Sequence, residues 1–302
     1  MKNKEMFGTL LALFAAVVSG IAIPLNKIFV VDIDPAVFTA VRAVIIGLVF
    51  LLISFQTHGM SRKLFRHDWK YFIFIAVVGG ALAFLLFFTG LKFTTAGRAA
   101  FLHKTLPIYV ALFAFFFLKE KIPRKQVYAL AIMLVGTLVI FSAQINPAEL
   151  WMNPQLGDML VLGATVLWAL ENVAAKKVMS DGAKNSIVSF ARMFFGGLVL
   201  FGAVALTNKF GVLFSLTVQQ WNNIFVSTVV LFGYVLFWFW SLRYINVSKA
   251  SILLLIAPVV SLVVGVMWLG EPAPLMQLVG SAAILIGAYF VSGIRSELKT
   301  GV

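Results

Sequence analysis

A few ionisable and polar side chains interrupt a sequence that is otherwise strongly apolar. Glu171 stands in the stretch LWALENVAAK, three residues after Trp168 and directly before Asn172. At helical spacing Trp168 and Glu171 share one face, with Asn172 at its edge. Such a face could bind an ammonium group, and Glu171 could take up and release a proton. The alternative is that Glu171 forms a structural ion pair with a nearby Lys or Arg.

A second polar pair, His103 and Lys104, stands just before Pro107 in another apolar stretch. At a separation of 151 residues its counterparts are Leu254 and Leu255, so packing does not require polar groups there. Lys104 is a candidate for binding a carboxylate, and an unperturbed His103 changes its charge near neutral pH. The alternative is that Lys104 extends towards the lipid headgroups.

Aromatic side chains form a third candidate group. Tyr234, Trp238 and Ser241 are spaced i, i+4 and i+7, so one helix face carries all three. Such a strip could line a cavity for apolar or aromatic solutes. The alternative is contact with lipid, or an aromatic belt at the membrane interface.

Sequence motifs of enzyme chemistry are absent. The chain contains no HExxH, no Walker loop, no GxSxG and no pair of His residues at metal-ligand spacing, and it has no Cys. We therefore expect a protein that is not an enzyme and that holds neither a cofactor nor a metal ion.

The composition requires a lipid environment for most of the chain. Of the 302 residues, 62% are hydrophobic and only 12% are charged, whereas a soluble domain has about 25% charged residues. A net charge of +13 would suggest nucleic acid as partner of a soluble protein. Here the bases lie mostly in short segments between apolar runs, which membrane topology explains better. The expected partners are the lipid bilayer and a small-molecule substrate, with no nucleic acid.

Ten apolar stretches have the length of about 20 residues that a membrane helix needs. We therefore predict an all-α membrane protein with ten transmembrane helices and no separate soluble domain. The predicted spans are 6–28, 35–56, 69–91, 96–118, 126–144, 157–178, 186–207, 222–243, 248–269 and 275–294.

The distribution of Lys and Arg predicts the orientation. With the N-terminus in the cytoplasm, the cytoplasmic segments hold 17 of the 24 bases and the outer segments three, while four lie within helices. Because cytoplasmic loops are enriched in Lys and Arg, we expect both termini in the cytoplasm and a multi-pass protein of the cytoplasmic membrane.

The two halves of the chain match each other at a separation of about 150 residues. We assign one repeat to 5–145 and the other to 156–295. Each half holds five spans, an odd number, so the second half enters from the opposite side and the repeat is inverted, an architecture that suits alternating access. Arg42 matches Arg192, and five further pairs share a separation of 151: Lys92 and Arg243, Arg98 and Lys249, Pro107 and Pro258, Glu120 and Glu271, Gly136 and Gly287.

The stretches TLPIYVALFAFFFLKEKI and IAPVVSLVVGVMWLGEPA resemble the fourth helix of each repeat in EamA-type members of the drug/metabolite transporter superfamily. In that family a Pro lies mid-helix and a Glu follows at the helix end. Pro107 with Glu120, and Pro258 with Glu271, match those positions. The resemblance implies ten helices, an inverted repeat, and export or exchange of small metabolites, often amino acids.

Several of the matched residues are expected to be structural. Arg42 and Arg192 could cap carbonyl groups or pair across helices, and Glu120 and Glu271 could pair with bases of adjoining helices. Pro107 and Pro258 would release backbone carbonyls at a cavity or hinge. Lys176, near a helix end, is expected to extend to the interface. The glycine pairs at 79–80 and 196–197 would let helices approach closely.

We therefore expect a secondary transporter that moves a small organic solute across the cytoplasmic membrane by alternating access. A cation and an anion near one cavity suit a zwitterion, which favours amino acids, and the resemblance implies export. The alternatives are an uncoupled facilitator or exchanger of other metabolites and, in another class, a membrane-embedded lipid-modifying enzyme. The sequence leaves the oligomeric state open, with a monomer as one option.

Overall fold

The computed structural model describes residues 2–29, 33–57, 62–142 and 145–296. Within this part the chain is helical and contains no strand. Ten segments are long and apolar enough to cross a membrane, which confirms the predicted number. Their bounds are Asn3–Asn26, Pro35–Gln56, Asp68–Gly90, Ala96–Leu118, Arg124–Phe141, Leu156–Ser180, Asn185–Leu206, Val218–Ser241, Val247–Leu269 and Leu275–Ser292.

Some of these spans are single helices and others are built from consecutive pieces. The single helices are α1 (Lys2–Phe29), α2 (Pro35–Gln56), α7 (Arg124–Phe141), α9 (Leu156–Ser180), α13 (Val218–Ser241) and α16 (Leu275–Ser292). The third span consists of α3 (Arg62–Phe74), η1 (Ile75–Leu82) and α4 (Ala83–Gly90), and the fourth of α5 (Ala96–His103), α6 (Leu106–Phe113) and η2 (Ala114–Leu118). The seventh consists of α10 (Asn185–Phe190), η3 (Ala191–Phe195) and α11 (Gly196–Leu206), and the ninth of α14 (Val247–Leu253), η4 (Leu254–Ile256) and α15 (Ala257–Leu269). The short helices α8 (Pro147–Met152) and α12 (Val212–Ser215) lie between spans.

The fourth and ninth spans are interrupted at matched positions. Lys104 and Thr105 separate α5 from α6, and the 3-10 turn η4 separates α14 from α15. Pro107 and Pro258 lie in the first turn of the helix that follows each interruption. A proline is tolerated there because the first amides of a helix have no partner within it. Both prolines therefore mark breaks, while a hinge function stays a prediction.

Two π-helical segments, η1 and η3, contact each other in the interior. Gly80 of η1 faces Gly196, which directly follows η3. An ideal Cβ on Gly80 would lie 2.3 Å from the carbonyl oxygen of Arg192 and 2.9 Å from the Cα of Gly196. Only glycine allows the two backbones to come this close, so the predicted packing role of these glycines is confirmed. Single π-turns inside helices often mark functional positions.

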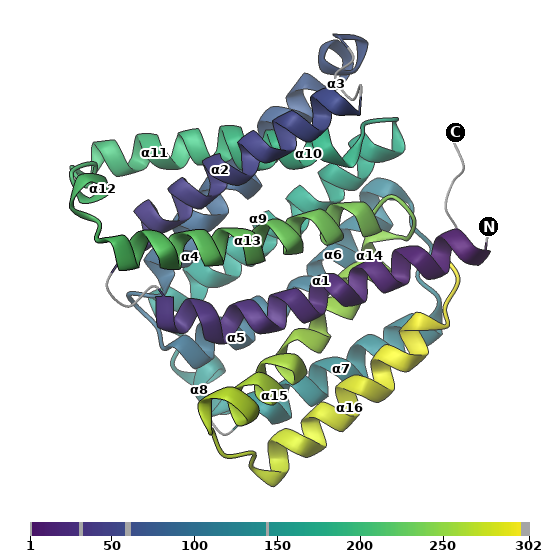
Figure 1. The fold of residues 1–302 in the computed structure, drawn as a ribbon. Coiled ribbons are helices and arrows are strands. Elements are labelled where there is room, and N and C mark those ends of the chain that lie inside the picture. Colours follow the sequence, from purple (N-terminus) through teal and green to yellow (C-terminus); the bar gives the residue numbers. More distant parts are fainter. Residues whose placement is uncertain (1, 30–32, 58–61, 143–144, 297–302) are drawn as a thin grey trace.

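The two halves interleave, because helices of one half pack along helices of the other. In Figure 1, α1 runs beside α13, and α7 runs beside α16. Helices α8 and α12 lie on the side opposite to the N-terminal end of α1 (Figure 1), as an odd number of spans in each half requires. The interface between the halves therefore runs through the centre of the bundle, where the candidate residues lie.

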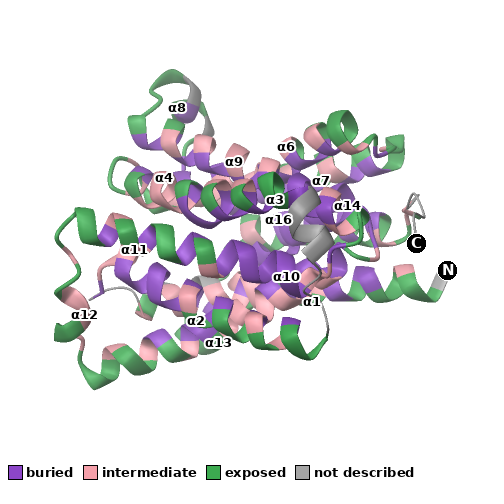
Figure 2. Ribbon diagram, turned by 90° about the horizontal axis from the view of Figure 1, so that it is seen from above, coloured by how far each residue is buried: buried purple, intermediate pink, exposed green. Residues whose placement is uncertain are grey.

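Burial follows the pattern expected of a protein solvated by lipid. Figure 2 shows buried residues where helices face one another and exposed residues along their outward faces. The outward faces carry large apolar side chains, among them Leu52, Phe117 and Trp268, which are 62%, 65% and 69% exposed. Lipid tails can solvate such surfaces and water cannot.

Asp34 links the start of α2 to the second half of the chain. Its Oδ1 accepts hydrogen bonds from the backbone amides of Ala36 and Val37, at 2.9 and 3.3 Å. Its Oδ2 accepts one from Lys209 Nζ at 2.5 Å. Partial burial raises the pKa of Asp34, but the bonds from Lys209 and the two amides outweigh this and hold the pKa below its usual value.

We expect Asp34 to make the folded state lose stability on acidification. The pKa of Asp34 is lower in the folded state than in the unfolded state. Its contribution to the free energy of unfolding is therefore complete at neutral pH and is lost between about pH 5 and the folded-state pKa. Asp34→Asn keeps a helix-capping oxygen but removes the charge. The melting temperature in detergent should therefore fall less from pH 7 to pH 3 in the variant than in the wild type. Equal falls in both proteins would contradict the prediction.

Candidate functional site

Glu171 is fully buried where α9 packs against η1, and its exposed fraction is 0%. Arg192 of η3 lies beside it, with Nε 3.3 Å from Oε1. Neither carboxylate oxygen, nor Arg192 Nε, makes an aligned hydrogen bond with any described group. The ion pair considered from the sequence is therefore present, and it leaves hydrogen-bonding capacity on Glu171 unused. The predicted roles of Glu171 in binding and proton coupling stay predictions.

A chain of hydrogen bonds joins the other residues that were predicted on α9 and α13. Trp168 Nε1 donates to the carbonyl oxygen of Gly79 at 3.1 Å, and Asn172 Nδ2 donates to that of Trp168 at 2.9 Å. Trp238 Nε1 donates to Asn172 Oδ1 at 2.8 Å, and the Tyr234 ring stacks on Trp238. Trp238 is only 2% exposed, so the alternative of lipid contact is wrong for this residue.

His103 reaches the same cluster from the broken fourth span. Its ring centroid lies 4.9 Å from that of Trp168 and 5.7 Å from that of Phe87. Its Nδ1 is buried and has no hydrogen bond with a described residue. Lys104, which follows it at the break, is half-buried, and its side chain forms no ion pair or hydrogen bond with the described part of the chain. The role of Lys104 in binding a carboxylate stays a prediction.

The third span contributes residues that the sequence reasoning missed as site residues. The Phe84 and Phe87 rings lie 5.1 and 5.5 Å from the Trp168 ring. Gly79 accepts the Trp168 hydrogen bond and packs directly on the Glu171 side chain. These residues carry no ionisable group, so the only signal for them was an aromatic-rich stretch after a glycine pair.

Two segments of the chain, residues 6–142 and 155–293, each match the EamA-like transporter family. The chain belongs to the EamA-like transporter family. It is therefore a multi-pass membrane transporter. Within the described residues of this EamA-like transporter, no group of three or more His, Asp or Glu side chains could hold a metal ion.

Two relatives align with this EamA-like protein over nearly the whole of the sequence. The uncharacterised transporter YyaM of Bacillus subtilis (strain 168) is 25% identical over 298 residues, which cover 97% of this chain and 95% of the relative. A protein of Salmonella typhimurium (strain LT2) named "Probable amino-acid metabolite efflux pump" is 27% identical. That alignment covers 98% of this chain and 97% of the relative. A solved crystal structure aligns with this chain with a TM-score of 0.76 and 18% sequence identity. The alignment covers 94% of this chain and 96% of the chain in that structure, which supports the fold.

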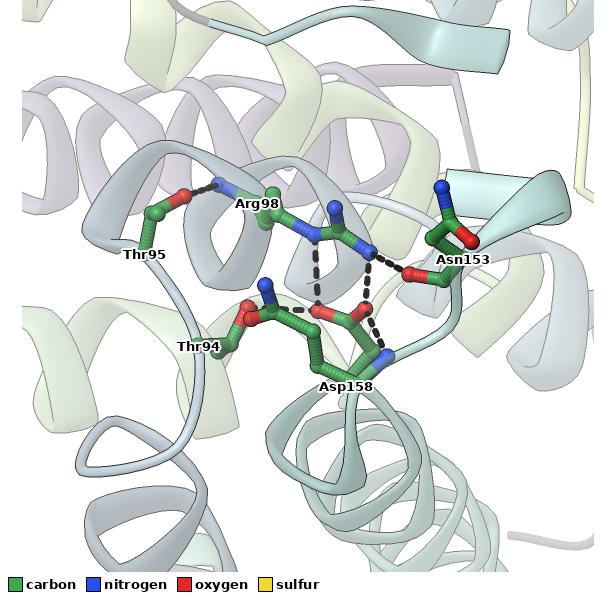
Figure 3. Close-up of polar contacts among 6 residues, drawn as sticks. Thr94, Thr95, Arg98, Asn153 and Asp158 are labelled. Carbon is green, nitrogen blue, oxygen red and sulfur yellow. Dashed lines mark hydrogen bonds and ion pairs between the residues drawn. The ribbon is translucent and has the colours of Figure 1, made fainter. Parts of the chain in front are cut away.

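In this EamA-like transporter Arg98 of α5 and Asp158 of α9 form a buried ion pair (Figure 3). Arg98 Nε also donates to Asp158 Oδ1 at 3.2 Å, and its Nη2 donates to the carbonyl oxygen of Asn153 at 3.0 Å. Thr94 and the amide of Gln155 donate to the same carboxylate, at 2.5 and 2.9 Å. We call this network the α5–α9 latch, because it ties the fourth span of one half to the first span of the other.

A matching latch lies at the opposite side of the membrane. Lys249 of α14 pairs with Glu5 of α1, with Nζ 3.3 Å from Oε1, and also donates to the carbonyl oxygen of Ile294 at 2.6 Å. The amide of Ser296 donates to Glu5 Oε1 at 2.5 Å. The repeat matches Lys249 with Arg98, so this α14–α1 latch is the counterpart of the α5–α9 latch.

Glu120 interacts electrostatically with a base, Lys176 of α9, as expected, but its hydrogen bonds come from α14. Its carboxylate accepts hydrogen bonds from the amides of Val247 and Ser248, at 3.0 and 3.2 Å, and from the Ser248 hydroxyl at 2.6 Å. A carboxylate is stabilised there because the first amides of a helix lack partners and carry partial positive charge. The carboxylate of Glu120 therefore also caps the start of α14, which is a structural role, as expected. Glu271 is exposed just after α15.

Lys176 is also placed differently from the expectation. Its side chain does not extend to the interface but is buried, at 7% exposure. Its Nζ donates to the carbonyl oxygens of Leu242 and Ile245, at 2.5 and 2.9 Å. A cation suits the C-terminal end of α13, where the last carbonyls lack partners.

Arg42 and Arg192 both pair across helices, as predicted. Arg192 of η3 pairs with Glu171 of α9. Arg42 of α2 donates to Ser227 Oγ of α13 at 2.7 Å. The two matched arginines therefore have different partners.

Proposed function

We propose that this transporter is a secondary carrier that exports zwitterionic solutes, most of all amino acids, by alternating access. Glu171 binds the ammonium group or carries the coupling proton, and Lys104 binds the carboxylate. The aromatic rings of Trp168, Tyr234 and Trp238 border the apolar part of the solute.

One observation carries this proposal. Glu171 is fully buried in the interior, and both of its oxygens lack aligned donors among the described residues, although Arg192 lies beside it. Charged groups inside a membrane protein are rare and usually belong to substrate or ion pathways. A carboxylate with unused acceptors is suited to bind an ammonium group or a proton. The name of the Salmonella typhimurium relative, an amino-acid metabolite efflux pump, supports the solute class and the direction.

The Arg192 ion pair favours a second candidate, an uncoupled exchanger. If Arg192 keeps Glu171 ionised throughout the cycle, no proton crosses with the solute. The two candidates differ in whether a pH gradient drives accumulation.

Counterflow into proteoliposomes tests the proposed function. Vesicles are preloaded with one of the twenty unlabelled amino acids, and uptake of a labelled amino acid is measured. Transient uptake that depends on the internal solute supports an amino-acid carrier. Absence of uptake across the panel, with folded protein inserted in the vesicles, would exclude the amino-acid assignment and leave other metabolites to be tested.

The absence of cysteine makes the proposed orientation easy to test, because a single introduced cysteine has no background. We expect Phe214→Cys, in α12, to react with a membrane-impermeant maleimide in intact cells, because Phe214 is 84% exposed on the proposed outer side. Asp181→Cys, after α9, should react only once the membrane is opened. The reverse pattern would invert the topology.

Alternating access predicts reciprocal behaviour of the two latches. Ala99→Cys beside Arg98 and Ala250→Cys beside Lys249 are matched probes, because both alanines are fully buried. We expect Arg98→Gln to open the α5–α9 side, since the variant removes one partner of a buried ion pair. Ala99→Cys should then react with maleimide roughly tenfold faster, the shift that about 1.4 kcal/mol produces.

The matched probe supplies the control. In the Arg98→Gln background, Ala250→Cys should react more slowly, because opening on one side excludes opening on the other. Lys249→Gln should give the mirror result. Faster reaction of both probes in either variant would indicate general loosening and would contradict reciprocal opening.

A further inference from the structure

Arg42 is a buried cation without a carboxylate partner among the described residues. Its side chain lies between α1, α2 and α13 and is only 6% exposed. Its Nε donates to the carbonyl oxygen of Phe38 at 3.2 Å, and its Nη1 donates to Ser227 Oγ at 2.7 Å. Asn26 Oδ1 lies 3.5 Å from Nη1, and the Phe38 ring lies 3.9 Å from the guanidinium. All of these neighbours are neutral.

The inverted repeat makes this lack of an acid informative. Arg192, the counterpart of Arg42, has Glu171 beside it. The matched pairs of the two halves are separated by 150 or 151 positions, so the counterpart of Glu171 is Ile21 or Gly20, within residues 18–22 of α1. That segment reads VSGIA and contains no acid. Among the described residues, the second half therefore supplies a carboxylate to its arginine, and the first half does not.

The hydrogen-bonding groups around Arg42 leave some N–H donors of its guanidinium unused. Ser227 donates its own proton to Asn26 Oδ1 at 2.7 Å, so its oxygen is oriented to accept from Arg42. The second amino group, Nη2, bonds to no described residue. An ionised side chain inside a membrane is costly unless an anion or polar groups stabilise it. A guanidinium binds a carboxylate with two parallel N–H groups, a geometry that Lys cannot provide.

The depths of the two arginines are also related by the repeat. Arg42 stands seven residues after Pro35, the first residue of α2, and Arg192 stands seven residues after Asn185, the first residue of α10. These helices begin on opposite sides of the membrane, so each arginine lies about 10 Å from its own side. A solute that crosses the protein would meet the two arginines in turn, roughly 10 Å apart along the membrane normal.

We propose that Arg42, held by Ser227 and Asn26, is a second anion subsite that binds the carboxylate of the transported solute in the outer half of the carrier. This inference rests on the proposed function, because it assumes that the solute carries a carboxylate. Glu171 and Arg192 then form the subsite of the inner half, and the solute carboxylate supplies at Arg42 the charge that Glu171 supplies at Arg192.

The test compares each amino acid with its amide, which keeps the ammonium group and lacks the carboxylate. Both are added from the α8–α12 side as competitors of amino-acid counterflow, with the wild type and with Arg42→Gln. We expect the wild type to be inhibited at least tenfold more strongly by the acids than by the amides. In Arg42→Gln this preference should fall about tenfold, while inhibition by the amides stays unchanged.

Two further variants separate recognition from folding. Arg42→Lys keeps the charge but lacks the two parallel N–H donors of a guanidinium. Its preference for the acids over the amides should lie between those of the wild type and Arg42→Gln. This variant keeps the test usable if Arg42→Gln does not fold. Ser227→Ala removes one neutral partner and should shift the preference less than Arg42→Gln does. A purely structural arginine would weaken inhibition by acids and amides equally, and that result would overturn the proposal. An absence of counterflow in the wild type would instead refute the proposed function, and with it this inference.

Discussion

Glu171→Gln is expected to abolish accumulation driven by a pH gradient while leaving exchange of solute across the membrane. A glutamine cannot take up and release a proton, so the solute should only equilibrate in the variant. The accumulation ratio of labelled amino acid in proteoliposomes with an imposed pH gradient should therefore fall from at least tenfold to about one. Counterflow without a gradient should continue.

Folding of this variant needs its own control, because Arg192 keeps its charge in the interior after Glu171 becomes neutral. Removing one member of a buried ion pair costs about 3–5 kcal/mol, whereas removing both members is often neutral. The matched control is Glu171→Gln combined with Arg192→Gln, which should melt near the wild-type temperature and still lack pH-driven accumulation. Unchanged pH-driven accumulation in this folded double variant would exclude Glu171 as the coupling group. A wild type that shows no pH-driven accumulation would instead favour the uncoupled exchanger.

Gly80→Ala is expected to destabilise the centre of the bundle and to reduce transport. The added Cβ would lie within 3.0 Å of backbone atoms of Arg192 and Gly196, and backbone cannot move aside as a flexible side chain can. Overpacking of this kind costs about 1–3 kcal/mol. We expect a melting temperature several degrees lower in detergent, together with slower counterflow, because η3 and Arg192 must move away from η1.

Gly202→Ala is the matched control for this prediction. Gly202 lies on α11, the helix that begins at Gly196, and no atom comes within 4 Å of an ideal Cβ there. Alanine favours a helix over glycine by about 1 kcal/mol, so this variant should be as stable as the wild type or slightly more stable. If Gly80→Ala melted at the wild-type temperature, the close approach of η1 and η3 would not be a constraint.

Membrane physics explains why so much of the fold could be predicted. The number of spans, their bounds within about four residues, and the breaks near Pro107 and Pro258 all follow from local sequence. Lipid allows only segments that satisfy their own backbone hydrogen bonds, so length and hydropathy nearly determine the helices. Internal similarity between the halves then predicted the repeat.

The candidate site could be predicted only in part. Periodicity placed Trp168 and Glu171 on one face of α9 with Asn172 at its edge, and Trp238 on α13 proved to bond to Asn172. Phe84 and Phe87 were missed because they carry no ionisable group and lie about 80 residues before Trp168 in the chain. No local pattern states which helix will face which.

The sequence by itself determined the environment, the helices and the inverted repeat, because these depend on composition and on spacing along the chain. Only the tertiary structure decided the partners of the buried charges. Glu171 pairs with Arg192, Glu120 caps a helix that begins 127 residues later, and Arg42 has only neutral neighbours in the described part. Such pairings depend on how helices cross and rotate, and small contributions from many packed side chains set these angles.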